Sequence, residues 1–171
     1  MKYDISALGN ALVDTQYMVD HDFLSEIGLE PDSMTLASAE EHSPIINKLN
    51  EIGAESVSDC GGSATNSLVA ASNYGSKCHH VCRVANDEDG KKYLDSLQIA
   101  GVEHIGFSKE DSELPTGKCL IFVTPDAKRT MSSMLGISAY LGPKDIDYEV
   151  IGDSKIFYIE GYMVTSDDNF N

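Results

Sequence analysis

Short runs rich in apolar residues, each ended by glycine or a polar cluster, recur along the chain and predict strands. These runs occupy residues 2–9, 34–37, 56–60, 77–84, 104–107 and 155–160. Segments with a helical spacing of apolar residues lie between them, at 20–29, 38–53, 64–74 and 87–101. Strands that alternate with helices in this way are typical of a mostly parallel sheet covered by helices. The pattern therefore predicts an α/β fold.

Two further parts of the chain predict a different and more exposed sheet. Residues 10–19 alternate between apolar and polar positions with a period of two. Residues 118–124 and 129–135 flank a turn at Pro125-Asp126 and predict a β-hairpin. Because such strands fit poorly in a buried parallel sheet, we expect them to pair with each other at its edge. The small second sheet would then be built from about residues 10–37 and 116–135.

A glycine loop precedes the helix predicted at 64–74. Gly61 and Gly62 can adopt positive φ and let a ligand approach the backbone. The first N–H groups of the helix would face the same space, and Asn66 on the first turn can both donate and accept hydrogen bonds. The alternative is a tight turn that only caps the helix, through Ser63 or Thr65. The pattern alone does not separate the two.

Asn10 and Asp14 share one face of the strand predicted at 10–19. In a straight strand they would lie roughly 13 Å apart, which is too far for one sugar ring unless the strand bends. An amide and a carboxylate on one face could bind a polar ligand. A half-exposed edge strand with ordinary polar residues is an equally good interpretation of this pattern.

The overall composition restricts the partners. The chain has 171 residues and a formal net charge of −16, from 28 acidic and 12 basic residues. This charge argues against nucleic acid or an anionic membrane as a partner. The length suits one domain, no stretch is apolar enough to span a membrane, and no signal peptide is evident, so we expect a cytoplasmic protein.

The cysteines do not form a metal motif. Cys78, His80 and Cys82 alternate along one predicted strand, which spaces them too widely for one tetrahedral ion, and no fourth ligand is evident. We therefore predict no metal site, and reduced, structural cysteines.

The glycine loop resembles the first signature of the PfkB, or ribokinase-like, family of carbohydrate and nucleoside kinases. The matching residues are Gly61, Gly62, Ala64, Asn66, Gly75 and Gly90. Leu68, where sugar kinases of the family usually have a small residue, and the gap between Asn10 and Asp14 are closer to the adenosine kinase branch. Segments 9–14, 116–117, 123–131 and 158–165 resemble further parts of the family pattern.

This resemblance implies a truncated ribokinase-like fold, with three α/β/α layers and a β-sheet lid. It implies that Asp14 accepts hydrogen bonds from sugar hydroxyls, that Gly117 lies at a substrate-side turn, and that Arg129 lies near the transferred phosphoryl group. Asn10 and Ser63 are candidates for contacting a base, Gly61 and Gly62 for backbone approach, and Asn66 for a further hydroxyl. The lid would close over the acceptor and could form a homodimer contact.

The resemblance covers only the first half of a family member. It therefore implies the acceptor-binding half of an ATP-dependent kinase that phosphorylates a hydroxymethyl group of a nucleoside or sugar. ATP, Mg²⁺ and the general base would come mainly from chain beyond Asn171, so the fragment alone is predicted to be inactive. The alternatives are a non-catalytic sugar- or nucleoside-binding module and, with less support, a structural dimerisation fragment.

Overall fold

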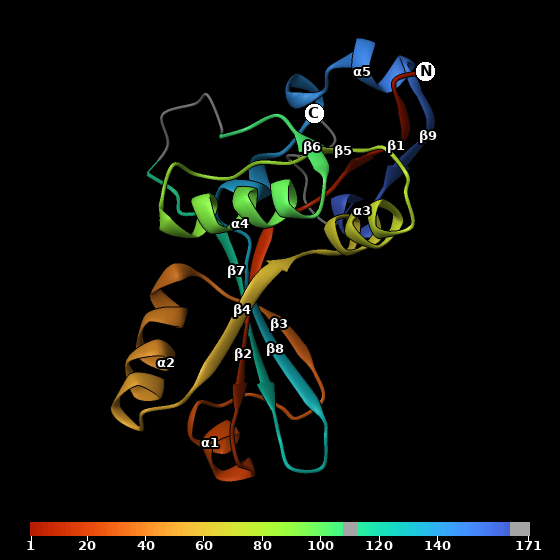
Figure 1. Cartoon of the computed structure of the whole chain (residues 1–171). Coiled ribbons are helices and arrows are strands. Elements are labelled where there is room, and N and C mark those ends of the chain that lie inside the picture. Colours follow the sequence, from red (N-terminus) through yellow and green to blue (C-terminus); the bar gives the residue numbers. More distant parts are fainter. Residues whose placement is uncertain (108–112, 165–171) are drawn as a thin grey trace.

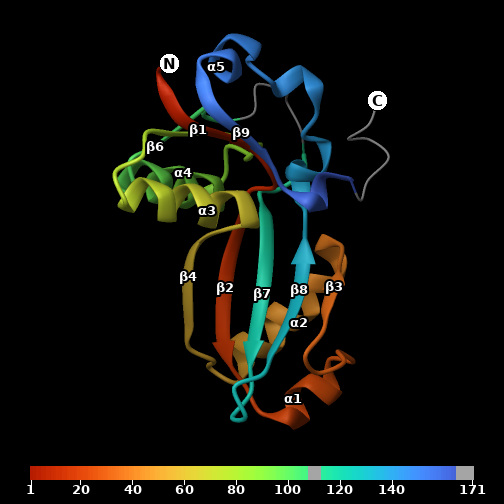
Figure 2. The ribbon, with the colours of Figure 1, turned by 90° about the vertical axis from the view of Figure 1, so that its right-hand side faces the viewer.

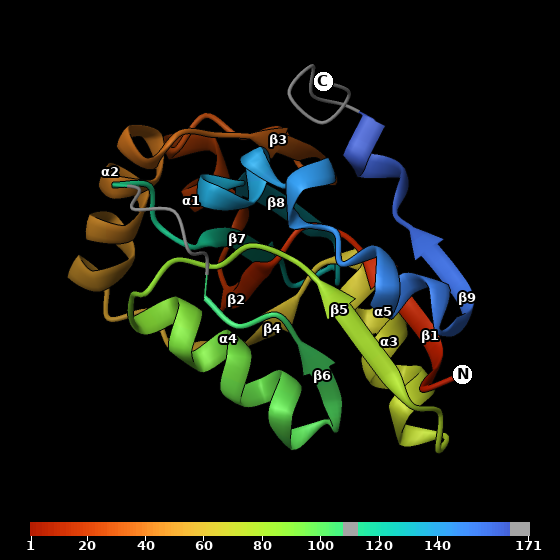
Figure 3. The same ribbon diagram turned by 90° about the horizontal axis from the view of Figure 1, so that it is seen from above.

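The computed structural model describes residues 1–107 and 113–164, and these residues form two sheets that meet end to end (Figure 1). Within them, the first sheet has four parallel strands in the order β6-β5-β1-β9, which lie side by side in Figure 3. The strands are β1 (Tyr3–Leu8), β5 (Cys78–Val81), β6 (Val102–His104) and β9 (Ser154–Ile159). Ile5 of the central strand β1 lies opposite Cys78 on one side and Ile156 on the other. The predicted parallel sheet is confirmed.

The second sheet has five strands in the order β3-β8-β7-β2-β4 (Figure 2). They are β2 (Leu12–Met18), β3 (Met34–Leu36), β4 (Ser56–Gly61), β7 (Gly117–Val123) and β8 (Arg129–Met134). The hairpin β7–β8 is antiparallel, as predicted, and it pairs with the earlier segment through β2 on one side and β3 on the other. The expected pairing of these two parts of the chain is therefore observed.

Helices cover both sheets. In the first sheet, α3 (Ser63–Asn73) and α4 (Glu88–Ile99) pack on one face, where Leu68, Tyr93 and Leu97 are buried. On the other face lie the short helices found between residues 136 and 164: η1 (Gly136–Tyr140), η2 (Pro143–Asp145), α5 (Tyr148–Gly152) and η3 (Gly161–Val164). No helix among the described residues is long and apolar enough to cross a membrane.

The second sheet has a separate core. Its outer face is covered by α1 (His21–Glu26) and α2 (Ala39–Glu51), which bury Phe23 and Leu49 against Leu120 and Phe122. Helix α2 begins at a capping box, in which the Ser38 hydroxyl accepts from the Glu41 N–H and the Glu41 carboxylate accepts from the Ser38 N–H. Since these helices cover only one face of this sheet, the opposite face is left to form a wall of the site described below.

Two expectations about the strands are wrong. Segment 56–60 was expected in the α/β body, but β4 pairs antiparallel with β2 at an edge of the second sheet. Its sequence, polar at Ser56, Ser58 and Asp59 and largely exposed, suits an edge strand rather than a strand buried on both faces. The strand expected at 104–107 is β6, which begins directly after helix α4 and ends at His104, before Gly106 turns the chain at a φ of 83°. Residues 166–168, Ser-Asp-Asp, predict the start of a further helix, and they lie outside the described residues.

Candidate functional site

A cavity of about 220 Å³ lies where the two sheets meet. One side of it is formed by the start of α3, the end of β9 and the connection between β1 and β2. The other is the inner face of the second sheet. The polar residues that line the cavity are Asn10, Asp14, Ser63, Asn66, Arg129, Ser133 and Glu160.

Side chains alternate between the two faces of the second sheet, and on the face toward the cavity many of them are apolar. On β7, Cys119 and Ile121 face the cavity, while the residues between and after them, Leu120 and Phe122, pack against α1 and α2. The same alternation places Met131 of β8 in the cavity wall. Leu12, Met34, Leu36, Leu135 and the ring of Tyr162 complete the apolar lining. Such a wall offers van der Waals contact to the apolar face of a small ring.

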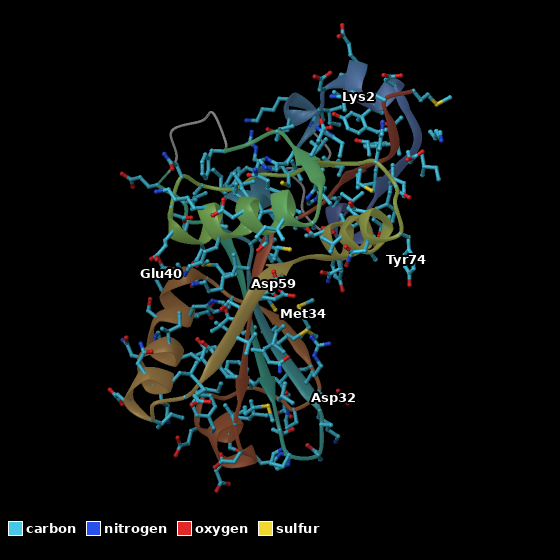
Figure 4. All side chains as sticks on the ribbon, viewed as in Figure 1. Lys2, Asp32, Met34, Glu40, Asp59 and Tyr74 are labelled. Atoms are coloured by element: carbon cyan, nitrogen blue, oxygen red, sulfur yellow. The ribbon has the colours of Figure 1, made fainter. Side chains whose placement is uncertain are left out.

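Asp14 lies on β2, directly opposite Asp59 of β4. Burial raises the pKa of Asp14 to about 6, the positive charge of Arg129 opposes this shift, and the negative charge of Asp59 adds to it. Figure 4 shows Asp59 on the part of β4 close to the first sheet. At neutral pH Asp14 is thus mostly a carboxylate, which can accept hydrogen bonds from hydroxyl groups at the edge of the apolar wall.

The two glycines of the loop are required for different reasons. A Cβ on Gly61 would lie 2.1 Å from Cγ of Asp14, so the carboxylate occupies the space that a side chain at position 61 would need. Gly62 has a φ of 100°, and a Cβ there would lie 2.3 Å from the backbone oxygen of Asn10. Gly61 therefore makes room for Asp14, whereas Gly62 makes room for the chain itself.

Asn10 lies outside the strand in which it was expected, because β2 begins only at Leu12. Asn10 lies in the connection between β1 and β2 and lines the same cavity as Asp14. Its side chain is only 4% exposed, and its Oδ1 has no hydrogen-bond partner. A buried amide oxygen without a donor is unfavourable by about 1–3 kcal/mol, so this atom is prepared to accept a hydrogen bond from a ligand.

Glu160 was not selected from the sequence, yet it connects the parts of the site. Its side chain is 2% exposed, and its two oxygens accept hydrogen bonds from the N–H of Asn10, at 2.7 Å, and the N–H of Ala64, at 3.0 Å. The available signals were a glutamate at the end of an apolar strand, where a charge is unusual, and its place in segment 158–165, which resembles the family pattern. Glu160 thus joins the end of β9 to both chain segments that carry polar site residues.

The start of α3 does not have the side-chain cap that one interpretation of the sequence expected. Gly62 is the N-cap and makes no side-chain cap, so neither Ser63 nor Thr65 caps the helix. The N–H of Ala64 is directed to Glu160 rather than left for a ligand. The Thr65 hydroxyl instead bonds to the hydroxyl of Tyr93, at 2.6 Å, which in turn lies 3.3 Å from Nδ1 of His80. These buried contacts hold the first turn of α3 against the first sheet.

Of the residues selected from the sequence, Asn10, Asp14, Gly62, Ser63, Asn66 and Arg129 line the one cavity. Gly61 lies beneath Asp14. Gly117 does not line the cavity. A Cβ at Gly117 would lie 2.6 Å from the backbone oxygen of Ala11 and 2.7 Å from that of Leu135, so glycine is required there because chain segments cross between the sheets.

The ribokinase-like α/β fold is the class that the parallel sheet, the second sheet and the cavity between them define. The chain matches the family model described as "pfkB family carbohydrate kinase" over residues 33–171, and it belongs to this family.

Solved structures share this fold. The adenosine kinase from Sinorhizobium meliloti is 32% identical, with a TM-score of 0.81, over 96% of this chain and 49% of that one. A probable sugar kinase from Rhizobium etli CFN 42 is 30% identical, with a TM-score of 0.85, over 96% of this chain and 48% of that one. Among curated proteins, adenosine kinase from Saccharomyces cerevisiae is 24% identical over 96% of this chain and 49% of its own length. The chain thus spans about half the length of each relative.

Proposed function

We propose that this chain forms the acceptor-binding half of an ATP-dependent kinase that phosphorylates a hydroxymethyl group of a nucleoside or sugar. The observation that carries the proposal is the unpartnered Oδ1 of Asn10, buried in the same cavity as the Asp14 carboxylate. Two acceptors beside an apolar wall suit a ligand with several hydroxyl or N–H donors and one flat apolar face. A nucleoside has both features.

Each polar group has a role in this proposal. Asp14 accepts hydrogen bonds from ribose hydroxyls, and Asn66 contacts a further hydroxyl. Asn10 and Ser63 contact the base, and the wall that contains Ile121 packs against it. Arg129 is exposed at the start of β8 and would contribute positive charge where negative charge develops on the transferred phosphoryl group.

The exposed edge of the first sheet supports the proposal that this is half of a larger unit. Strand β9 carries the apolar run Ile156-Phe157-Tyr158-Ile159, which is typical of a strand buried on both faces. Yet Ile156 is 57% and Ile159 50% exposed. We propose that chain corresponding to the unmatched half of the relatives covers this edge and supplies most of the ATP and Mg²⁺ binding. Within the described residues, no group of three His, Cys, Asp or Glu side chains could hold a metal ion.

Titration calorimetry with adenosine and with ribose tests the acceptor site. We expect saturable binding of at least one of them, and Asp14→Asn should weaken it by at least about tenfold, since a charged hydrogen bond is lost. Asp32→Asn is the matched control, because Asp32 is exposed in the turn before β3, away from the junction (Figure 4), and asparagine tolerates its φ of 61°. Equal affinities for Asp14→Asn and the wild type would contradict the role of Asp14. Absence of binding to both ligands would contradict the proposed acceptor class.

The kinase part of the proposal needs a second measurement, the intact mass of the protein purified from its own cells. A mass about twice the 18.5 kDa of this chain, together with ATP-dependent phosphorylation of the bound acceptor, would support the kinase. A mass of 18.5 kDa, with binding but no phosphorylation, would instead support a non-catalytic binding module.

A further inference from the structure

The carboxylate of Asp87 connects helix α4 to the second sheet. It accepts three hydrogen bonds: from the N–H of Gly90 at 2.7 Å, the N–H of Thr116 at 2.8 Å and the hydroxyl of Thr116 at 2.7 Å. The first is the N-cap of α4. The other two reach Thr116, the residue that precedes β7 and lies 29 positions away in the sequence.

The hydrogen bonds around Asp87 are mutually satisfied, and the backbone beside them is tightly packed. The Thr116 hydroxyl also accepts a hydrogen bond from the N–H of Ala85 at 3.0 Å, so every polar group of the cluster has a partner of the right kind. A Cβ on Gly90 would lie 2.1 Å from the backbone oxygen of Ala85 and 2.9 Å from the Thr116 hydroxyl. Burial alone would raise the pKa of Asp87, but the hydrogen bonds from Thr116 and Gly90 hold it below its usual value. Asp87 is therefore a carboxylate that only accepts.

The position of Thr116 matters for the cavity. The next residue, Gly117, touches the backbones on either side of the junction between the sheets, and β7 then carries Cys119 and Ile121 into the cavity wall. A second link follows at once, because Lys118 of β7 pairs with Asp89 of α4 at 2.7 Å. The N-cap and first turn of α4 are thus bonded to Thr116, just before β7, and to Lys118 within it.

We propose that Asp87 is a positioning residue that sets the orientation of the second sheet against the first sheet. Through that orientation it sets the distance between the apolar wall and the polar residues at the start of α3. The consequence for ligand binding rests on the proposed function, whereas the orientation itself does not.

An ordinary N-cap is the alternative, and the chain contains one for comparison. Asp20 caps α1 through a single hydrogen bond, from the N–H of Phe23 at 2.8 Å. Asparagine is about as good an N-cap as aspartate. In Asp87→Asn the amide oxygen can still cap α4, but its NH₂ group must face a donor, the Thr116 N–H, if the oxygen serves Gly90. The substitution therefore separates capping from the link to β7.

Residual dipolar couplings of the backbone amides test the orientation without any ligand. In Asp87→Asn we expect the couplings of the second sheet no longer to fit one alignment tensor together with those of α3 and α4. Hydrogen exchange at the Thr116 amide should accelerate by roughly tenfold or more, as expected when a charged hydrogen bond is lost. Asp20→Asn should change neither quantity. Unchanged couplings and unchanged Thr116 exchange in Asp87→Asn would overturn the proposal.

Substitutions at Thr116 keep the test decisive if Asp87→Asn does not fold. Thr116→Val removes the hydroxyl and should change the couplings in the same direction as Asp87→Asn. Thr116→Ser keeps the hydroxyl, and its couplings should match those of the wild type. Adenosine affinity is then measured on the same proteins. A wild type that binds no adenosine would count against the proposed function and leave the couplings to decide the role of Asp87. An adenosine affinity that falls equally in Asp20→Asn and Asp87→Asn would overturn the specific effect on the cavity.

Discussion

Replacement of Glu160 by glutamine should lower the free energy of unfolding by about 3 kcal/mol, because the glutamate is a buried double acceptor. Its two oxygens bind the N–H groups of Asn10 and Ala64, at 2.7 and 3.0 Å. Glutamine has nearly the same shape but only one acceptor oxygen. Its NH₂ group would be placed against one of the two backbone N–H groups, and both of these lie in the interior.

The magnitude follows from two contributions. A hydrogen bond to a charged group contributes about 1.5–3 kcal/mol, and leaving a buried donor without a partner costs about 1–3 kcal/mol. Removing the buried charge offsets part of this sum, since the desolvation penalty of the carboxylate disappears. For a chain of this length, 3 kcal/mol corresponds to a fall in Tm of roughly 6–12 °C.

Urea denaturation followed by circular dichroism measures this change. Glu55→Gln is the control, because Glu55 is exposed and its replacement removes the same negative charge from a chain of net charge −16. We expect the control to be as stable as the wild type or slightly more stable. If Glu160→Gln and Glu55→Gln had the same midpoint and slope, the two hydrogen bonds would not stabilise the fold and the argument would be wrong.

Three further predictions concern the residues around Glu160. Because the pKa of Asp14 is raised from 3.8 to about 6 in the folded chain, the fold loses stability as the pH rises from about 4 to about 6 and stays destabilised above that, so Asp14→Asn should raise Tm at pH 8 but not at pH 4. If the ligand requires the carboxylate, its affinity should fall about tenfold between pH 7 and pH 5, as calorimetry at the two pH values would detect. Gly61→Ala should displace the Asp14 carboxylate and abolish adenosine binding with little change in Tm. Gly62→Ala should lower Tm strongly, because it strains a backbone with a φ of 100°. The reverse pattern would refute the separate roles of the two glycines. Tyr93→Phe removes a fully buried hydroxyl and should lower the free energy of unfolding by about 1–2 kcal/mol in urea, whereas Tyr74→Phe, at a side chain 92% exposed, should have no effect.

Much of the fold could be predicted because its signals are local. The capping box at Ser38 and the hairpin around Pro125-Asp126 depend on residues a few positions apart, and both are observed. The apolar runs of the parallel strands were equally clear. By contrast, β4 belongs to the second sheet because it pairs with β2. No pattern of neighbouring residues predicts which strand it pairs with.

The candidate site divides in the same way. Asp14, Gly62 and Asn66 could be selected because each belongs to a recognisable segment, and the structure places all three at one cavity. Glu160 could not be assigned a contact, because its two partners lie 150 and 96 positions earlier in the chain. Asn10 lies before β2, which begins at Leu12, although the alternation of residues 10–19 predicted one continuous strand.

The sequence by itself determined the α/β class, the pairing of residues 10–37 with the hairpin at 116–135 and most of the polar residues of the site, since periodicity, turn residues and glycine spacing act over short distances. Only the tertiary structure decided how the two sheets meet, which distant segments the carboxylates of Glu160 and Asp87 bond, and which side chains face the cavity. The physical reason is that a buried polar group is stable only when its hydrogen bonds are satisfied, and its partners are set by the approach of distant segments. Glu160 bonds the end of β9 to Asn10 and Ala64, and Asp87 bonds the start of α4 to Thr116 before β7.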